Sequence, residues 1–251
     1  MCIFLHFFHS ASNMSDFSSR TELLLGEEAV KKLTSANILA VGVGGVGGYA
    51  VEMLARAGIG RMTIVDGDNI DSSNLNRQIA ATIPAIGLSK AQVMADRIKN
   101  INPDIKLTVI NRFLMESDVR PLLDSQDFTF IADAIDSVGT KCALIREAFD
   151  AGIPIISSMG AGARLDPDRI SIVKLSMTHH DGLSKAVRKK FTNSNIPKLL
   201  DVVFSDEPAR EYAVVESDTP GRKMTVGTVS WIPAMFGCRM ARHIVEKIIA
   251  E

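Results

Sequence analysis

The sequence predicts a doubly wound α/β protein with a mostly parallel, Rossmann-like sheet and a C-terminal extension of short strands and helices. Up to about residue 157, short apolar runs alternate with segments of helical periodicity, which implies parallel strands with helices on both faces. A glycine-rich turn joins the first apolar run to an amphipathic helix. Beyond Gly160-Ala-Gly162 the elements become shorter, so we expect residues 14–160 and 161–251 to form two regions of one globular unit.

The individual elements follow from local patterns. Expected strands cover residues 38–41, 61–65, 106–110, 128–132, 154–157, 170–175 and 202–204. Expected helices cover residues 26–33, 49–57, 74–81, 89–99, 117–123, 140–150, 182–191 and 227–250. Gly58 suits the end of the helix at 49–57. Residues 193–196 and 209–223 are expected loops, the second polar enough to be mobile.

The composition is ordinary for a soluble globular protein, with 46% apolar and 23% charged residues among 251. The net charge of −1 does not indicate binding to nucleic acid or to a membrane, so any basic surface must be confined to one part of the protein. Cys2, Cys142 and Cys238 are scattered and form no C-x-x-C pair. This argues against a disulfide framework and against structural zinc, and favours a reducing cytoplasm.

Neither end of the chain has the pattern of a membrane segment. Residues 1–13 lack a basic region and a cleavage site, so we expect a disordered or mis-called extension, with Met14 as the true start. Residues 227–250 are apolar but interrupted by charges such as Arg239 and Glu246. A buried closing helix is therefore favoured over a membrane span.

The glycine-rich turn carries Gly42, Gly44, Gly45 and Gly47, three of which form a G-x-G-x-x-G pattern between a strand and a helix. Glycine permits the tight turn and lets a phosphate approach the backbone. The helix that follows offers unpaired N–H groups to an anion. We therefore expect a nucleotide site here, the alternative being a glycine-rich turn without a ligand.

Polar and charged residues follow this turn in close succession. Asp66 lies 19 positions after Gly47, where a Rossmann fold places its ribose carboxylate, and alone would indicate NAD. The chain then adds Asp68, Asn74, Arg77, Gln78, Lys90 and Asp136. A nucleoside triphosphate carries about four charges, which calls for cations such as Arg77 and Lys90. Asp136 is of the type that holds Mg²⁺, although each residue singly could be an ordinary surface charge or helix cap.

These motifs resemble those of the adenylating superfamily of ubiquitin-activating enzymes and their bacterial relatives MoeB and ThiF. The resemblance covers about residues 20–154 and is carried by Gly42-Val-Gly-Gly-Val-Gly-Gly, Asp66-Gly-Asp68, Asn74-Leu-Asn-Arg77-Gln78, Gly87-Leu-Ser-Lys90, Ile101-Asn-Pro103 and Asp133-Ala-Ile-Asp136. The missing zinc cysteines, Ser137 and the turn Gly160-Ala-Gly162 are more similar to one branch, the tRNA threonylcarbamoyladenosine dehydratases (TcdA or CsdL enzymes).

The resemblance implies roles for individual residues. The turn glycines would surround the phosphates of ATP, Asp66 would bind the ribose, and Asp136 would lie near Mg²⁺. Phosphate contacts would come from Asn74, Arg77 and Lys90, and Asp68 and Gln78 are further candidate nucleotide contacts. Arg20 aligns with an arginine that reaches the phosphates of a neighbouring subunit, which implies a homodimer.

The implied reaction is ATP-dependent dehydration of threonylcarbamoyladenosine next to a tRNA anticodon, by adenylation of its carboxylate and intramolecular ring closure. No enzyme cysteine is needed for this step, and Cys142 and Cys238 are interpreted as structural. A basic cluster, Lys185, Arg188, Lys189 and Lys190, is the candidate tRNA contact, the alternative being a solvated helix face. Proteins of a sulfur relay are further candidate partners.

Three other functions share parts of this pattern. A sulfur-carrier adenylyltransferase of the MoeB or ThiF type would use the same ATP site but normally carries zinc cysteines. An NAD-dependent oxidoreductase would explain only the glycine turn and Asp66. A catalytically idle nucleotide-binding adaptor in a sulfur relay would bind ATP without releasing pyrophosphate.

Overall fold

The structure is a computed structural model that describes residues 17–216 and 224–250. Within them, seven strands form one sheet in the order β3-β2-β1-β4-β5-β7-β6. The strands are β1 (Asn37–Val41), β2 (Arg61–Val65), β3 (Lys106–Ile110), β4 (Phe130–Asp133), β5 (Ile155–Ser158), β6 (Ile170–Lys174) and β7 (Asp201–Ser205). All neighbours pair in parallel except β6, which runs antiparallel to β7. The fold class expected from the sequence is confirmed.

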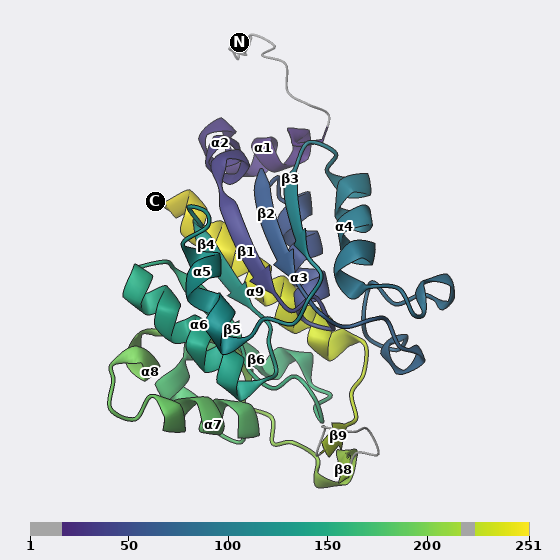
Figure 1. Cartoon of the computed structure of the whole chain (residues 1–251), viewed down its shortest axis with the longest axis vertical. Coiled ribbons are helices and arrows are strands. Elements are labelled where there is room, and N and C mark those ends of the chain that lie inside the picture. Colours follow the sequence, from purple (N-terminus) through teal and green to yellow (C-terminus); the bar gives the residue numbers. More distant parts are fainter. Residues whose placement is uncertain (1–16, 217–223, 251) are drawn as a thin grey trace, which may run out of the picture.

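Helices cover both faces of this sheet (Figure 1). They are α1 (Ser19–Leu25), α2 (Glu27–Ser35), α3 (Gly47–Arg56), α4 (Lys90–Ile101), α5 (Val119–Leu123), α6 (Val138–Ala151), α7 (Gly182–Lys190), α8 (Ile196–Leu199) and α9 (Trp231–Ala250). Short 3-10 turns are η1 (Ser72–Asn74), η2 (Ile83–Ala85), η3 (Glu116–Asp118), η4 (Pro167–Arg169), η5 (Leu175–Met177) and η6 (Glu211–Ala213).

The central strand β1 is buried along its whole length because both of its faces are covered. Ile38 and Ala40 pack in the core beneath α3, α4 and α9, whereas Leu39 and Val41 pack in the core beneath α5, α6 and α7. This alternation follows from the period of two in a strand. Parallel pairing brings the carboxyl ends of β1, β2, β4, β5 and β7 to one edge of the sheet, where ligands bind in folds of this type.

The C-terminal segment contributes to the same sheet. Strand β7 extends the parallel sheet beside β5, and β6 adds the antiparallel edge. A separate hairpin is formed by β8 (Val214–Glu216) and β9 (Met224–Val226). Helix α9 then returns across the sheet and packs so closely on α3 that a methyl group on Gly237 would lie 2.4 Å from the Val46 carbonyl oxygen.

Each strand expected from the sequence is present, with ends that agree to within about two residues. The expected helix at 74–81 is wrong: η1 and a few turns occupy this stretch. Its backbone is redirected by side chains, because Asp71 accepts from the Ser73 N–H and Asn74 accepts from the Asp71 N–H, and such bonds compete with helix formation.

Other differences are smaller. Helix α1 was not expected, and α8 begins at Ile196, the last residue of an expected loop. The expected loop at 209–223 contains η6 and β8, and its residues 217–223 lie outside the described residues. Helix α9 begins at Trp231 rather than at 227, and places Pro233 in its first turn, where no N–H is needed.

The expected N-terminal extension at residues 1–13 also lies outside the described part of the chain. Among residues 17–216 and 224–250, no helix combines the length and apolar character needed to span a bilayer.

Candidate nucleotide site

The glycine turn between β1 and α3 lies at the carboxyl edge of the sheet, and two of its glycines have no space for a side chain. Gly42 has φ +85°, and a methyl group there would lie 2.8 Å from the Ala134 carbonyl oxygen at the end of β4. A methyl group on Gly47 would lie only 1.8 Å from the Gly42 carbonyl oxygen. Glycine is therefore required at both positions, by conformation at one and by space at both.

Asp66 holds this turn against the end of β2. Its carboxylate accepts hydrogen bonds from the N–H groups of Val43 and Asp68, each at 2.8 Å. Burial raises the pKa of Asp66 above its ordinary value, and the two N–H donors offset part of this effect. The predicted ribose carboxylate thus lies directly beside the glycine turn.

Asp66→Asn is expected to gain stability relative to the wild type as the pH rises. The raised pKa means that the folded protein holds this proton more tightly than the unfolded chain does. Ionisation then destabilises the fold: the penalty is absent below the ordinary pKa of 3.8 and complete above the raised pKa. Urea unfolding at about pH 3.5 and pH 7 without nucleotide measures this change. Asp104→Asn, at an exposed position, is the control. The prediction is contradicted if the difference in unfolding free energy between Asp66→Asn and the wild type is the same at both pH values.

The segment after β2 folds back over the glycine turn. A methyl group on Gly45 would lie 3.8 Å from the Arg77 Cγ, and one on Gly44 would lie 3.7 Å from the Gln78 Nε2. The Arg77 Nη1 donates to the Ser73 carbonyl oxygen at 2.6 Å and to the Asn76 side chain at 2.9 Å. Gln78 is only 8% exposed, and its Oε1 has no hydrogen-bond partner among the described residues.

Lys90 and Asn74 complete this side of the site. Lys90 is buried at the first position of α4 and donates to the Asp68 carboxylate at 2.8 Å. Asn74 is also buried, and its carbonyl oxygen accepts from the N–H groups of Arg77 and Gln78. Charged and polar side chains that are separate in the sequence are therefore gathered around one turn.

Asp136 reaches the same edge from β4. It is exposed and lies two residues beyond Ala134, the residue that touches Gly42. The loop before it is anchored by Asp133, whose Oδ1 accepts from the Ile135 N–H at 3.0 Å.

A buried ionic cluster behind this loop was not predicted from the sequence. Lys141 and Asp133 are both fully buried, with Nζ 2.7 Å from Oδ2. Lys141 also donates to the Ser157 Oγ at 2.9 Å and to the Ser158 carbonyl oxygen at 3.1 Å, and the Ser157 hydroxyl donates to Asp133 at 2.6 Å. The cluster joins the carboxyl ends of β4 and β5 to α6.

Arg20 is not brought to this site within one chain. It lies exposed on α1, next to residues that line a cavity at the amino ends of β2 and β3. The glycine turn is at the opposite edge of the sheet (Figure 1). Any contact of Arg20 with a nucleotide therefore requires a second copy of the chain.

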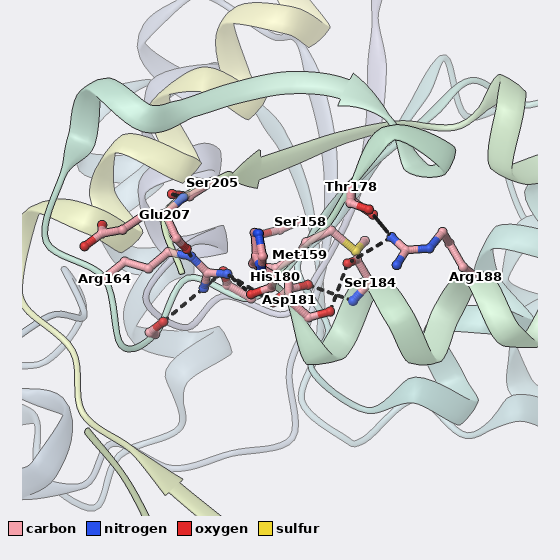
Figure 2. A network of polar contacts seen from close by, with 12 residues as sticks. Ser158, Met159, Arg164, Thr178, His180, Asp181, Ser184, Arg188, Ser205 and Glu207 are labelled. Atoms are coloured by element: carbon pink, nitrogen blue, oxygen red, sulfur yellow. Dashed lines mark hydrogen bonds and ion pairs between the residues drawn. The ribbon is translucent and has the colours of Figure 1, made fainter. Parts of the chain in front are cut away.

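The predicted tRNA-contacting cluster divides into two parts. Lys185, Lys189 and Lys190 are exposed on α7. Arg188 instead turns back toward the start of the helix and donates to the carbonyl oxygen of Thr178 at 2.7 Å, and to its hydroxyl (Figure 2).

The amino end of α7 is fixed at the carboxyl edge of the sheet by Arg164 (Figure 2). This buried arginine donates to the carbonyl oxygens of Gly160 and Gly162 at 2.6 and 3.0 Å, and pairs with Asp181 at 3.4 Å. Asp181 in turn caps α7 by accepting from the Ser184 N–H. The basic helix is thus held at the edge that carries the glycine turn.

The described cysteines do not have the character of nucleophiles. Burial raises the pKa of the Cys142 and Cys238 thiols, which keeps both protonated. Among residues 17–216 and 224–250, no three His, Cys, Asp or Glu side chains converge as a metal site.

A glycine turn at a helix N-terminus, with Arg77, Lys90 and several carboxylates around it, defines a nucleotide-binding protein of the Rossmann-like class. Comparison with known proteins makes this more specific. The profile of the ThiF family matches residues 18–251. The chain belongs to the ThiF family.

Several characterised proteins are similar over nearly the whole chain. A tRNA threonylcarbamoyladenosine dehydratase of Bacillus subtilis (strain 168) is 34% identical over 241 residues, covering 93% of this chain and 94% of the relative. The crystal structure of the Escherichia coli enzyme, TcdA, in complex with ATP superposes with a TM-score of 0.83 at 36% identity, covering 92% and 93% of the two chains. The E. coli molybdopterin-synthase adenylyltransferase is 33% identical, but over only 56% of this chain.

Proposed function

We propose that this protein is an ATP-dependent tRNA threonylcarbamoyladenosine dehydratase. The observation that carries the proposal is the similarity to the ATP-bound E. coli dehydratase, which extends over more than nine-tenths of both chains. The cations and carboxylates around the glycine turn agree with it, because they exceed what a dinucleotide pyrophosphate needs. Because the similar bacterial proteins are named for the modification of tRNA, we also propose a cytoplasmic location.

The residues at the turn fit ATP. The Gln78 side chain lies beside Gly44 through its Nε2, and its buried Oε1 has no partner among the described residues, which calls for a donor from a ligand or bound water. Arg77, Lys90 and Asn74 would hold the phosphates, and Asp66 the ribose. Asp136 would hold Mg²⁺ together with phosphate oxygens, since this ion usually takes one or two carboxylates and phosphate ligands. When bound, the ion would neutralise charge on the phosphates.

The proposed reaction begins with an attack on the α-phosphorus of ATP. A carboxylate is a poor electrophile because its negative charge repels a nucleophile. Its oxygen would attack the α-phosphorus of ATP, forming an acyl adenylate and expelling pyrophosphate, while Arg77 and Lys90 stabilise the growing negative charge. A nitrogen of the same substrate side chain would then attack the acyl carbon, lose its proton and expel AMP. This ring closure is intramolecular and is therefore favoured by proximity.

The tRNA would be held partly by the exposed lysines of α7, which face solvent near the carboxyl edge. Phosphate contacts of this kind are independent of sequence and sensitive to salt. Arg188 would contribute less to tRNA binding than these lysines, because it is only partly exposed and donates to both the carbonyl oxygen and the hydroxyl of Thr178.

Charge reversal of Lys185, Lys189 and Lys190 to Glu is expected to weaken tRNA binding about tenfold or more in dilute salt. Each lost phosphate contact should also lower the slope of log K against log salt by about 0.9. Filter binding at several salt concentrations measures both effects, and the Kd for ATP should not change. The control reverses Lys31, Arg242 and Lys247, three exposed cations away from this edge. Equal effects of the two triple variants on tRNA binding would mean that the α7 lysines form a solvated helix face and do not contact the tRNA.

A homodimer is also proposed. Arg20 is exposed far from the glycine turn of its own chain, so its expected role at the phosphates needs a second subunit. Leu23 and Leu24 on the same helix are 79% and 83% exposed. Exposed leucines of this size favour an interface between subunits.

The decisive experiment is mass analysis of tRNA nucleosides after incubation of tRNA that carries threonylcarbamoyladenosine with the protein and ATP. Loss of one water from threonylcarbamoyladenosine, with release of AMP and pyrophosphate, is the expected result. Pyrophosphate release that requires a small sulfur-carrier protein instead of tRNA would favour the molybdopterin-synthase adenylyltransferase type of activity. No pyrophosphate with either substrate would indicate an idle adaptor.

A further inference from the structure

Trp231 is an aromatic side chain at the edge of the nucleotide site that the reaction described above does not use. It is the first residue of α9 and the chain's one tryptophan. Its side chain is 48% exposed, although a large apolar ring is normally well buried. An exposed ring next to a site suggests contact with a ligand.

The first turn of α9 borders the glycine turn. Pro233 lies two residues after Trp231, and its Cβ would be 3.2 Å from a methyl group on Gly45. Just before the helix, the Thr228 carbonyl oxygen accepts from the Asn76 side chain at 3.1 Å. Asn76 adjoins Arg77, the proposed phosphate contact. Trp231 therefore lies in the chain between Thr228 and Pro233, two residues that contact the segments around the glycine turn.

The indole ring is held in one orientation. Its Nε1 donates to the Leu165 carbonyl oxygen at 2.9 Å. Leu165 is fixed in turn, because its N–H and that of Asp166 both donate to the Glu207 carboxylate at 2.9 Å. The same loop is anchored by Arg164, which also donates to the Glu207 carbonyl oxygen (Figure 2). A ring held in this way loses little freedom when a ligand stacks on it.

We propose that Trp231 is a stacking platform for an unpaired nucleobase of the anticodon loop, next to the base whose side chain is adenylated. This inference rests on the proposed function. Bases in single-stranded RNA loops are recognised by stacking on aromatic faces, and such stacking tolerates different bases. The α7 lysines would hold the backbone of the RNA, while Trp231 would bring the loop to the ATP.

Because Trp231 is the one tryptophan, indole emission reports on this residue alone. Protein saturated with AMP is titrated with an anticodon stem-loop RNA that carries threonylcarbamoyladenosine, and saturable quenching is expected. Trp231→Ala should raise the KM for tRNA about tenfold or more and leave the KM for ATP unchanged. Trp231→Phe should restore most of the tRNA KM, because the ring face remains. Leu199→Ala, which truncates an exposed apolar residue on α8, is the matched control.

Unchanged emission and an unchanged tRNA KM in Trp231→Ala would overturn the proposal while the wild type still forms the cyclic nucleoside. Emission that depends on protein concentration but not on RNA would also overturn it, and would place the ring between copies of the chain. If the wild type forms no cyclic nucleoside but RNA still quenches the indole, the proposed reaction fails and the stacking site stands.

Discussion

Arg77→Ala is expected to lower the rate of ATP-dependent turnover about 100-fold or more, the effect of losing a preorganised electrostatic donor. Lys90→Ala should have an effect of the same order, because its ammonium group is buried beside the glycine turn. In the proposed reaction the two cations would stabilise charge that grows on the expelled pyrophosphate, so we expect kcat to fall more than the affinity for ATP. Pyrophosphate release and product formation at saturating ATP and tRNA measure the effect.

The controls separate charge from geometry. Arg77→Lys keeps the charge but loses the planar fork of donors, and should recover only part of the activity. Arg242→Ala removes an exposed arginine that pairs with Glu246 near the far end of α9, and should retain wild-type turnover. Full activity of purified Arg77→Ala would mean that Arg77 has no role in the reaction. The proposal that the site binds a triphosphate would then lack its main positively charged residue.

The sequence predicts the sheet well because its strands are short and bounded by breakers. Residues 38–41 are an unbroken apolar run that ends at Gly42, and both faces of β1 are indeed buried. The helix predicted at 74–81 is wrong, since the side-chain-to-backbone bonds of Asp71 and Asn74 depend on local geometry that composition does not reveal. Helical periodicity also does not say that α9 starts at Trp231.

The candidate site was predictable to the extent that its residues follow the glycine turn in order. Asp66, Arg77 and Lys90 come from segments that parallel strands bring to one edge, and the structure gathers them there. Trp231 was assigned to a buried helix, because nothing in its apolar surroundings indicates that the ring lies half exposed.

The sequence does not single out Lys141, because a lysine in a helix is normally exposed. The spacing does carry a signal, because Lys141, Leu144, Ile145 and Ala148 recur at helical intervals on the buried face of α6. A lysine on such a face needs an acidic partner. Asp133 at the end of the preceding strand was the available carboxylate.

Lys141→Met is expected to lower the free energy of unfolding by about 3–5 kcal/mol, because it leaves the Asp133 carboxylate buried and without its cation. Asp133 would keep only the Ser157 hydroxyl and the Ile135 N–H as donors. Urea unfolding followed by circular dichroism measures the loss, and Lys190→Met, at an exposed position on α7, should stay within about 0.5 kcal/mol of the wild type.

The double variant Lys141→Met with Asp133→Asn distinguishes an unpaired charge from a loss of packing. Removing both charges should recover much of the lost stability, since a buried ion pair contributes little net energy although breaking it is costly. Activity should not recover in parallel, because the two carboxylate oxygens of Asp133 accept from the Ile135 N–H and the Ser157 hydroxyl, and the single amide oxygen of Asn cannot replace both in orienting the loop that carries Asp136. A double variant as unstable as Lys141→Met would instead mean that packing of the lysine chain, and not its charge, holds the ends of β4 and β5.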